Sequence, residues 1–465
     1  MPTSLPAKQP TSLSTLMVAF LLQASCLVGL LWFTPRTDFV AVIAWFLGMF
    51  AAYLWVMNQL PRWDTIKGVL AAGVLLRFLA FWALPELSND YFRFLWDGSL
   101  TVYGENPFLS LPSEITADPA RLAALGLDND WFQALNSPEY YTIYPPVLQM
   151  LFALGAWLAE GDLYEGVLVL KASIFLAEVG SLWMMLRLLK RWKLPLHWLG
   201  WYALNPLVIA EWSGNLHFEA LMIFFLLWSI DLLSQEKWQL ASFPFFLAVA
   251  TKLLPLMLMP LLIRRLGWKR VFIFGSIVGS LFLISFIPFF SSSIADWPAE
   301  LLQTLQNIRQ SFSLYVEVFE FNASLWYVIR AIGFGLVGWN VIHQVGPFLS
   351  LIIIVGIFVY SFREKRPDWP GLPASMMWVF LGYFALATIV HPWYACSLVA
   401  MSVFTTFRYP VVWTVFLPFT YATYRTDLYE ENLWWVALEY LILLGWILWE
   451  LKQIRRNGVR NLGPT

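Results

Sequence analysis

The chain has 465 residues, of which 59% are hydrophobic and only 13% are charged. Soluble domains typically carry about 25% charged residues, so this composition excludes an ordinary soluble protein and indicates one embedded in a lipid bilayer. A formal net charge of −1 argues against a nucleic-acid partner. The two cysteines, Cys26 and Cys396, lie far apart in apolar segments, which favours small buried residues over a disulfide or a metal site.

Apolar runs divide the chain into membrane spans, each of which needs about 20 apolar residues. Spans are expected at 14–33, 38–58, 67–84, 166–187, 271–290, 345–362, 374–390, 394–407, 410–424 and 433–450. A long polar loop, 85–144, and a second long loop, 291–343, separate some of them. We therefore predict an all-α polytopic membrane protein, a single domain over 1–465 with about 11–14 transmembrane helices and no separate soluble domain.

Three apolar segments are too short or too polar for a simple span. Residues 145–158 begin with two prolines and are short, which suits an interfacial or re-entrant helix. Residues 197–233 contain the polar corner WSGNLHFEA, which predicts two helices joined there. Residues 239–262 have basic groups near both ends, so both ends are expected on one side, with a break at 251–255 near Lys252. Broken helices at membrane depth occur only inside protein or beside a cavity.

Lysine and arginine set the orientation, because cytoplasmic loops of membrane proteins carry an excess of both. The basic clusters RLLKRWK, which ends the span at 166–187, and FREKR, which ends the span at 345–362, are therefore assigned to the cytoplasm. This assignment places the loops 85–144 and 291–343 outside the cytoplasm. We expect an integral protein of the bacterial inner membrane, with its functional face turned to the periplasm or the exterior.

The stretch 87–108, LSNDYFRFLWDGSLTVYGENPF, departs most from the apolar character of the chain. Its two carboxylates, Asp90 and Asp97, lie seven residues apart with Arg93 between them. If 89–96 is helical, the three side chains share one face, because such spacings are close to whole turns. An acidic, aromatic-flanked helix can hold a sugar and supply a base. The alternative is that the acids are caps or solvated loop residues, and Asp97 is the better candidate for bracing the loop and orienting Arg93.

The orientation brings other polar groups to the same side as Asp90. They come from the turn before 145–158, the corner in 197–233, the loop 291–343 and the HPWY segment, with Lys252 below them. Each has a simpler interpretation: a helix start, hydrogen-bonded interfacial histidines, a solvated loop acid and a snorkelling lysine. The candidate substrate-binding residues are Arg93, Asp97, Tyr144, Asn215, His217, Glu219, Lys252, Glu320, Asn322, His391 and Tyr394.

A transferase outside the inner membrane cannot use nucleotide sugars and needs a donor that arrives with the membrane, such as a polyprenyl-phosphate sugar. Transfer requires a general base beside the acceptor hydroxyl, for which Asp90 is the candidate. It also requires a cation where charge develops on the leaving phosphate, for which Lys252 and Arg93 are candidates. The candidates for orienting the sugar are Tyr144, Asn215, His217, Asn322 and His391.

Two other functions compete with a transferase. Transporters or flippases of lipid-linked sugars bind near the midplane and tend to show repeat symmetry, whereas these polar groups gather at one face beside a long loop. A structural assembly subunit would leave the polar cluster without a role. The enzyme is therefore the favoured interpretation.

The same stretches resemble a known family. SNDYFRFLWDG followed by GENPF resembles the D-x-Y-R-Y-x-W-D-G…N-P-Y loop of bacterial GT-C-fold glycosyltransferases, nearest the polyprenol-phosphomannose-dependent α-mannosyltransferases. IYPPVLQMLF resembles the Y-P-P-x-x-Q segment of that family, and NPLVIAEWSGNLHFEALM resembles its G-N-x-H-x-D/E-A-L-M corner. ATKLLPLMLMPLL, FEFNASLWY and HPWY have counterparts in the same order.

The resemblance implies a GT-C-like helical bundle with a catalytic extracytoplasmic first loop. It implies inverting transfer of a hexose, with mannose resting on the resemblance alone, from a polyprenyl-phosphate donor to a glycan or glycolipid acceptor, with Asp90 as base. The chain departs from the pattern at Phe92 and Phe94, and at Glu219, where Asp is common. It has no D-x-D or E-x-D pair, because Asn89 stands beside Asp90. We therefore expect no metal and no other cofactor.

Overall fold

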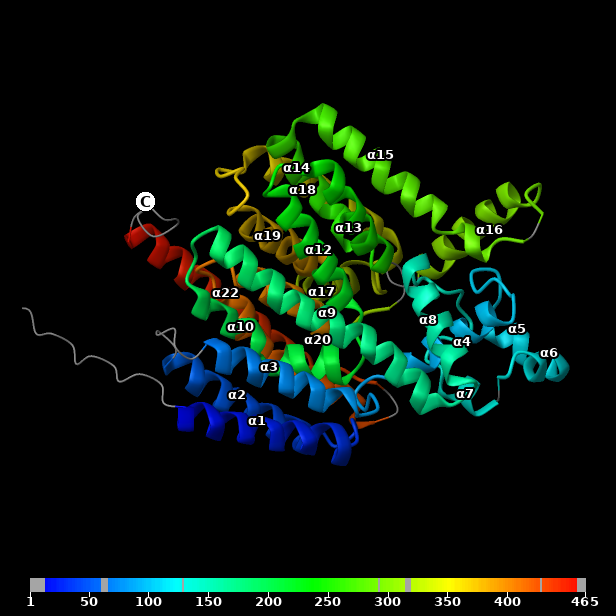
Figure 1. Cartoon of the computed structure of the whole chain (residues 1–465), viewed down its shortest axis with the longest axis horizontal. Helices are drawn as coiled ribbons and strands as arrows, with labels where there is room; N and C mark the ends of the chain where they lie inside the picture. Colours follow the sequence, from blue (N-terminus) through cyan, green and yellow to red (C-terminus); the bar gives the residue numbers. More distant parts are fainter. Residues whose placement is uncertain are drawn as a thin grey trace, which may run out of the picture.

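The computed structural model describes residues 13–59, 66–127, 129–291, 293–313, 319–426 and 429–457. Within these ranges the chain is helical without strands, and one isolated β-bridge joins Phe321 to Ile389. Six described helices are long and apolar enough to cross a membrane: Ser14–Phe33, Phe39–Gln59, Leu163–Arg191, Trp268–Phe289, Ile342–Arg363 and Leu433–Arg456. This confirms an all-α polytopic membrane protein, which Figure 1 shows as an elongated bundle.

The chain begins with α1 (Leu13–Phe33), α2 (Phe39–Gln59) and α3 (Ile66–Phe81), close to the first three expected spans. α1 and α2 are almost entirely apolar, and Pro35 lies in the turn between them. Proline has no amide hydrogen to continue a helix. In Figure 1 the three helices run side by side along one edge of the bundle.

The expected polar loop 85–144 folds into a cap of short helices at one end of the bundle (Figure 1). These are α4 (Asp90–Val102), α5 (Pro112–Thr116), α6 (Pro119–Ala124) and α7 (Asn129–Ala134). Trp96 and Leu100 of α4 pack with Ile115 and Leu127 in a small core of their own. The helix predicted to carry the two carboxylates is confirmed, and apolar packing of Trp96 and Leu100 holds it in the cap.

The cap joins the bundle through α8 (Pro146–Ala159), which is as short as expected and has Pro146 in its first turn. α4 lies so close to α8 that a Cβ atom on Gly98 would collide with the carbonyl oxygen of Phe152. Only glycine permits this approach of two backbones. The 29-residue span α9 (Leu163–Arg191) follows.

Both predicted broken segments are present. A 3-10 turn η2 (Leu196–Leu199) and the one-turn helix α10 (Gly200–Ala203) lead into the bend. The helical segment Pro206–Gly214, made of α11 (Pro206–Val208) and the π-helical turn η3 (Ile209–Gly214), meets α12 (Glu219–Leu233) at 109°. α13 (Trp238–Thr251) ends where Lys252 is extended, with φ −154° and ψ 135°. The chain resumes in η4 (Leu254–Leu258) and α14 (Met259–Leu266).

The C-terminal half comprises α15 (Trp268–Ile284), η5 (Ile287–Phe289), α16 (Trp297–Ser313), α17 (Leu325–Val337), α18 (Ile342–Arg363), α19 (Leu372–Leu386), α20 (Pro392–Ser402), α21 (Tyr409–Phe416), η7 (Leu417–Arg425) and α22 (Leu433–Asn457). Here two spans are shorter than expected: α20 has 11 residues, and α21 has eight before Pro418 helps tighten the chain into a 3-10 helix. The loop 291–343 includes the apolar helix α17. Residues 292 and 314–318 of that loop lie outside the described ranges.

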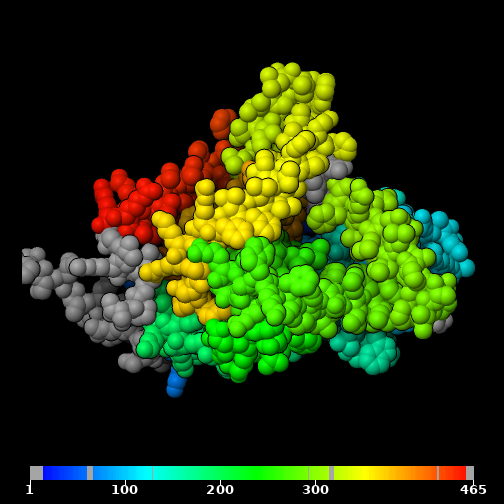
Figure 2. All heavy atoms as spheres, turned by 90° about the horizontal axis from the view of Figure 1, so that it is seen from above, coloured from blue at the N-terminus to red at the C-terminus, as the bar shows by residue number. Residues whose placement is uncertain are grey.

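The cap has a second support from α16. Asn307 donates from Nδ2 to the carbonyl oxygen of Phe108 at 2.9 Å, and Phe108 packs with Phe286 and Phe289. Figure 2 shows α15 and α16 lying against the cap at the same end of the molecule. The stretch that carries Asp90 is therefore held between α8 and α16.

A fully buried ion pair fastens α3 to α9. Arg77 donates from Nε to the Glu178 carboxylate and from Nη1 to the carbonyl oxygen of Ala203 at 2.7 Å. The Tyr202 hydroxyl donates to the other oxygen of Glu178. Because all these groups are excluded from water, each charge is compensated only by its protein partners.

Candidate active site

The link between α3 and α4 is held at both ends, which fixes where Asp90 lies. Lys171 of α9 donates from Nζ to the carbonyl oxygens of Ala80 and Ala83 at 2.8 and 2.5 Å. Asn215 accepts a hydrogen bond from the Leu87 amide at 3.0 Å on its side-chain oxygen. The polar corner predicted to bind substrate thus first serves to anchor the chain just before Asp90.

Asp90 begins α4, where the positive end of the helix dipole favours a carboxylate. It is half-buried, and Asn136 donates from Nδ2 to its Oδ1 at 2.6 Å. Burial raises the pKa of the Asp90 carboxyl above its ordinary value, and Glu219 adds to this effect; the Asn136 hydrogen bond and the charges of Lys252 and Arg36 oppose it. The charges of Lys252, Glu219 and Arg36 therefore reach this carboxyl.

Lys252 projects from the break after α13 and forms an ion pair with Glu219 at the start of α12. Its ammonium nitrogen also lies 4.3 Å from the centroid of the Tyr394 ring, a cation–π contact. Lys252 therefore contacts both Glu219 and Tyr394, and the charges of Lys252 and Glu219 reach the Asp90 carboxylate. These four residues come from separate segments of the chain. The side chain of Lys252 remains 31% exposed, so it is accessible to a ligand.

Near the Lys252–Glu219 ion pair, two histidines stack on opposite sides of Trp393. The centroids of His217 and Trp393 are 3.8 Å apart, and those of His391 and Trp393 are 4.3 Å apart. His217 Nδ1 lies 2.8 Å from the carbonyl oxygen of Glu211, which requires a proton on Nδ1. His217 Nε2 and His391 Nδ1 are buried without a hydrogen-bond partner in the described part of the chain. Buried polar atoms without a partner are uncommon in folded proteins and mark a candidate contact for a polar ligand.

The corner between Asn215 and His217 contains a strained residue. Leu216 has φ +63° although it is not glycine, and it is almost fully buried. A left-handed conformation of a non-glycine residue costs of order 1–3 kcal/mol and persists only where the surroundings impose it. The bend lets Asn215 point to Leu87 and His217 to Trp393.

Comparison with known families decides what kind of protein carries this arrangement. Residues 11–266 match the model of the alpha-(1->6)-mannopyranosyltransferase N-terminal domain, and residues 141–392 match the model of glycosyltransferase family 87. Each match spans more than half of the chain. The chain belongs to these membrane glycosyltransferase families. The comparison with curated proteins gave no match. Together the two matches include Asp90, Lys252 and His391.

Two residues of the glycosyltransferase that were predicted to bind substrate form an ion pair with each other. Arg93 and Asp97 are buried and form an ion pair at 2.7 Å. Arg93 also donates to the carbonyl oxygens of Ser137 and Tyr140 at 3.1 and 2.9 Å, while Gln149 donates to Asp97 at 3.0 Å. The pair therefore braces the cap, and Arg93 is less available than Lys252 to meet a phosphate.

Two further candidates, Tyr144 and Glu320, make contacts outside the group around Lys252. Tyr144 packs on Phe94 and Phe152, with centroids 5.1 and 5.4 Å apart. Glu320 pairs with Arg330 and accepts a hydrogen bond from Asn340 at 2.7 Å. These contacts keep Glu320 at the junction of α17 and α18.

Asn322 is held by two acids near the C-terminal helix. The backbone N–H of Asn322 donates to the Glu431 carboxylate at 2.6 Å, and its side-chain Nδ2 donates to the Glu439 carboxylate at 3.0 Å. The neighbouring Phe321 forms the β-bridge to Ile389. Asn322 thus helps to dock the segment that precedes His391, and its contacts are structural.

Residues that the sequence did not single out complete the site: Arg36, Asn136, Glu211, Trp393 and Tyr421. Tyr421 donates to the Glu211 carboxylate at 2.5 Å, which fixes the turn that holds His217. Glu211 could have been chosen as a candidate from the sequence, because an acid inside an apolar segment is a functional candidate by default. Asn136 was not, because its partner Asp90 is 46 residues away along the chain.

The described residues include no group of three or more His, Cys, Asp or Glu side chains arranged to hold a metal ion. Asn89, next to Asp90, donates from Nδ2 to the carbonyl oxygen of Ala134 at 2.9 Å. It therefore serves the fold of the cap and offers no second carboxylate beside Asp90.

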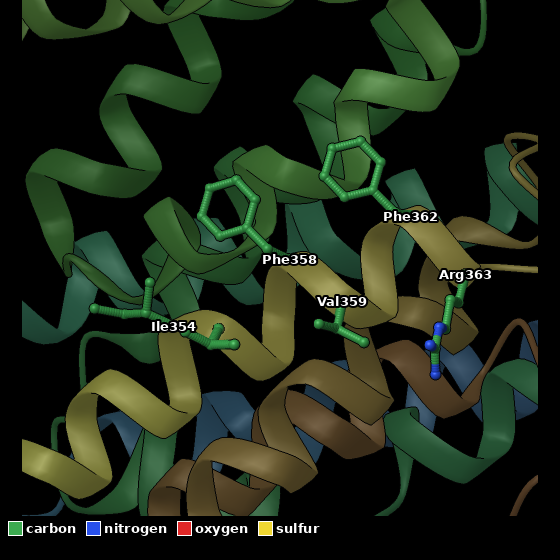
Figure 3. A pocket seen from close by; sticks show the side chains of 6 residues that line it. Ile354, Phe358, Val359, Phe362 and Arg363 are labelled. Carbon is green, nitrogen blue, oxygen red and sulfur yellow. The ribbon is translucent and has the colours of Figure 1, made fainter.

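A separate open groove of about 440 Å³ lies on α18. Its lining residues are Ile354, Val355, Phe358, Val359, Phe362 and Arg363. Figure 3 shows these side chains along successive turns of α18. With one polar side chain, the groove lacks the groups that orient a sugar, so the candidate active site of the glycosyltransferase remains the Asp90 cluster.

Proposed function

We propose that this glycosyltransferase moves a hexose, mannose in the first instance, from a polyprenyl-phosphate sugar to a glycan or glycolipid acceptor. The observation that carries the proposal is that a half-buried carboxylate, Asp90, lies within electrostatic reach of the accessible ammonium of Lys252. A base and a cation are the two groups that displacement of a sugar phosphate needs. Mannose is supported by the printed description of the mannopyranosyltransferase family.

The proposed reaction is a single inverting displacement. The acceptor hydroxyl oxygen bonds to C1 of the sugar as the bond between C1 and the phosphate oxygen breaks. The hydroxyl proton passes to the Asp90 carboxylate, and the electron pair of the broken bond leaves with the polyprenyl phosphate. Lys252 stabilises the negative charge that develops on this phosphate. Tyr394, which already contacts Lys252, and the free nitrogen atoms of His217 and His391 are placed to orient the sugar.

We propose that the reaction needs no metal, because Lys252 supplies the positive charge and Asn89 takes the place of a second carboxylate. We also propose that the site faces the periplasm or exterior of a bacterial inner membrane. The basic ends of α9, α14 and α22 support this orientation by the positive-inside rule. They carry Lys190, Arg191, Arg264, Arg265, Arg455 and Arg456.

The donor class is tested by incubating the purified protein with radiolabelled polyprenyl-phosphate mannose, glucose and arabinose, and separately with a nucleotide sugar, in the presence of a glycolipid extract. We expect a labelled covalent product from polyprenyl-phosphate mannose and none from the nucleotide sugar. Label that crosses vesicle membranes without a covalent product would instead identify a transporter of lipid-linked sugars and overturn the proposal.

A further inference from the structure

The start of α4 is tied to the segment 134–140, which lies over it. Asn89 donates to the carbonyl oxygen of Ala134 at 2.9 Å, and Arg93 donates to that of Tyr140 at 2.9 Å. Between these two contacts a hydrogen bond runs from the segment to α4: the Asn136 side chain donates to Asp90 at 2.6 Å. The segment is thus fastened by α4 at both ends and in return holds the Asp90 side chain.

The amide of Asn136 has a defined orientation. Ser137 donates from Oγ to Asn136 Oδ1 at 3.0 Å, so the amide oxygen is used and the NH₂ group faces Asp90. On the carboxylate, Oδ1 accepts this bond. In the described residues, no side chain or amide donates to Asp90 Oδ2. The two oxygen atoms of Asp90 are therefore inequivalent before any substrate binds.

We propose that Asn136 is a positioning residue that holds Asp90 Oδ1 and leaves Oδ2 as the atom that takes the acceptor proton. This inference rests on the proposed function, in which Asp90 is the base. A hydrogen bond to the ionised form of an acid stabilises that form, so Asn136 also opposes the effect of burial. It keeps the carboxylate ionised, as a base must be, at a lower pH than burial alone would allow.

The direction in which loss of Asn136 shifts the pKa of Asp90 can be predicted. Without the donated hydrogen bond the pKa of Asp90 rises, because burial and Glu219 continue to raise it while only Lys252 and Arg36 oppose them. The charged and titratable groups near Asp90 are Glu219 from α12, Lys252 from the break after α13, Arg36 from the α1–α2 turn and Tyr424 from η7. None of these is altered by the substitution, so the acidic limb of the rate profile must move to higher pH.

The test is Asn136→Ala in the full-length protein, assayed for sugar transfer between about pH 4 and 9. We expect kcat to fall about tenfold or more, as for loss of a hydrogen bond to a charged group. We further expect an unchanged KM for the lipid donor and partial recovery of kcat at high pH. Asn136→Asp should shift the acidic limb further, because a second carboxylate would face Asp90.

Glu139→Gln is the matched control. Glu139 lies in the same segment but accepts a hydrogen bond from Ser113 at 2.9 Å, and in the described part of the chain it is not joined to Asp90 by a hydrogen bond. It should retain the wild-type rate and pH profile. A wild-type profile in Asn136→Ala, or a lower kcat with no shift of the acidic limb, would overturn the positioning role. Asp90→Asn separates this outcome from failure of the proposed function: if that variant remains active, Asp90 is not the base at all.

Discussion

Replacing Asp90 with asparagine is expected to lower kcat for sugar transfer by about 10²–10⁴-fold, the contribution typical of a positioned general base. The amide has nearly the same shape as the carboxylate but cannot take the acceptor proton. The KM for the lipid donor should change little, because Lys252, His217 and His391 remain in place. The measurement is initial rate against donor concentration for wild-type and variant protein at equal folded concentration.

The pH dependence of the wild-type enzyme provides an independent check on Asp90. Because burial raises the pKa of this carboxyl, the acidic limb of kcat/KM should lie above the range of an exposed aspartate. Activity should fall as pH decreases through this raised pKa, since the base works only when ionised. Asp90→Glu is the control that keeps a titrating base, and it should retain more activity than Asp90→Asn. Full activity in Asp90→Asn would remove Asp90 from the mechanism.

Replacing Arg77 with methionine should lower the free energy of unfolding by about 3–5 kcal/mol, the cost of breaking a buried ion pair. Arg77 and Glu178 are both inaccessible to solvent. Removal of Arg77 leaves the Glu178 carboxylate buried with only the Tyr202 hydroxyl as partner. Thermal or denaturant unfolding in detergent, compared with wild type, measures the loss.

The double variant Arg77→Met with Glu178→Gln separates charge from packing. It removes both charges, and the side-chain amide oxygen introduced at position 178 would still accept a hydrogen bond from Tyr202. The double variant should therefore recover most of the stability lost by Arg77→Met alone. If the single variant is as stable as wild type, the pair does not hold α3 to α9. If the double variant is less stable than the single one, lost packing rather than an uncompensated charge explains the effect.

Much of the architecture follows from local patterns in the sequence. Basic residues near both ends of 239–262 predicted that both ends lie on one side of the membrane and that the helix is broken between them. The helix does end at Lys252. The polar corner in 197–233 required a bend, and a bend of 109° is present. These features depend on where polar groups lie along an apolar chain, because a helix at membrane depth can be interrupted only inside protein or beside a cavity.

What the sequence could not provide is which polar groups pair with one another. Arg93 was a candidate for the phosphate, but it is engaged by Asp97 and by backbone carbonyls of 137–140. Lys252 was a candidate as well, and its pairing with Glu219 depends on how α12 meets the break after α13. Such contacts join residues far apart in the chain, so neither spacing nor periodicity reports them.

The most direct test of the central claim is the anomeric configuration of the product. A single displacement at C1 with Asp90 as base requires that the new glycosidic bond have the configuration opposite to that of the sugar phosphate in the donor. The measurement is the one-bond coupling between C1 and its proton in product made from ¹³C-labelled polyprenyl-phosphate mannose by purified enzyme, compared with the same coupling in the donor. Inversion is the predicted result. Retention of configuration would mean a covalent or two-step route and would contradict the assignment of Asp90 as the base of a one-step transfer.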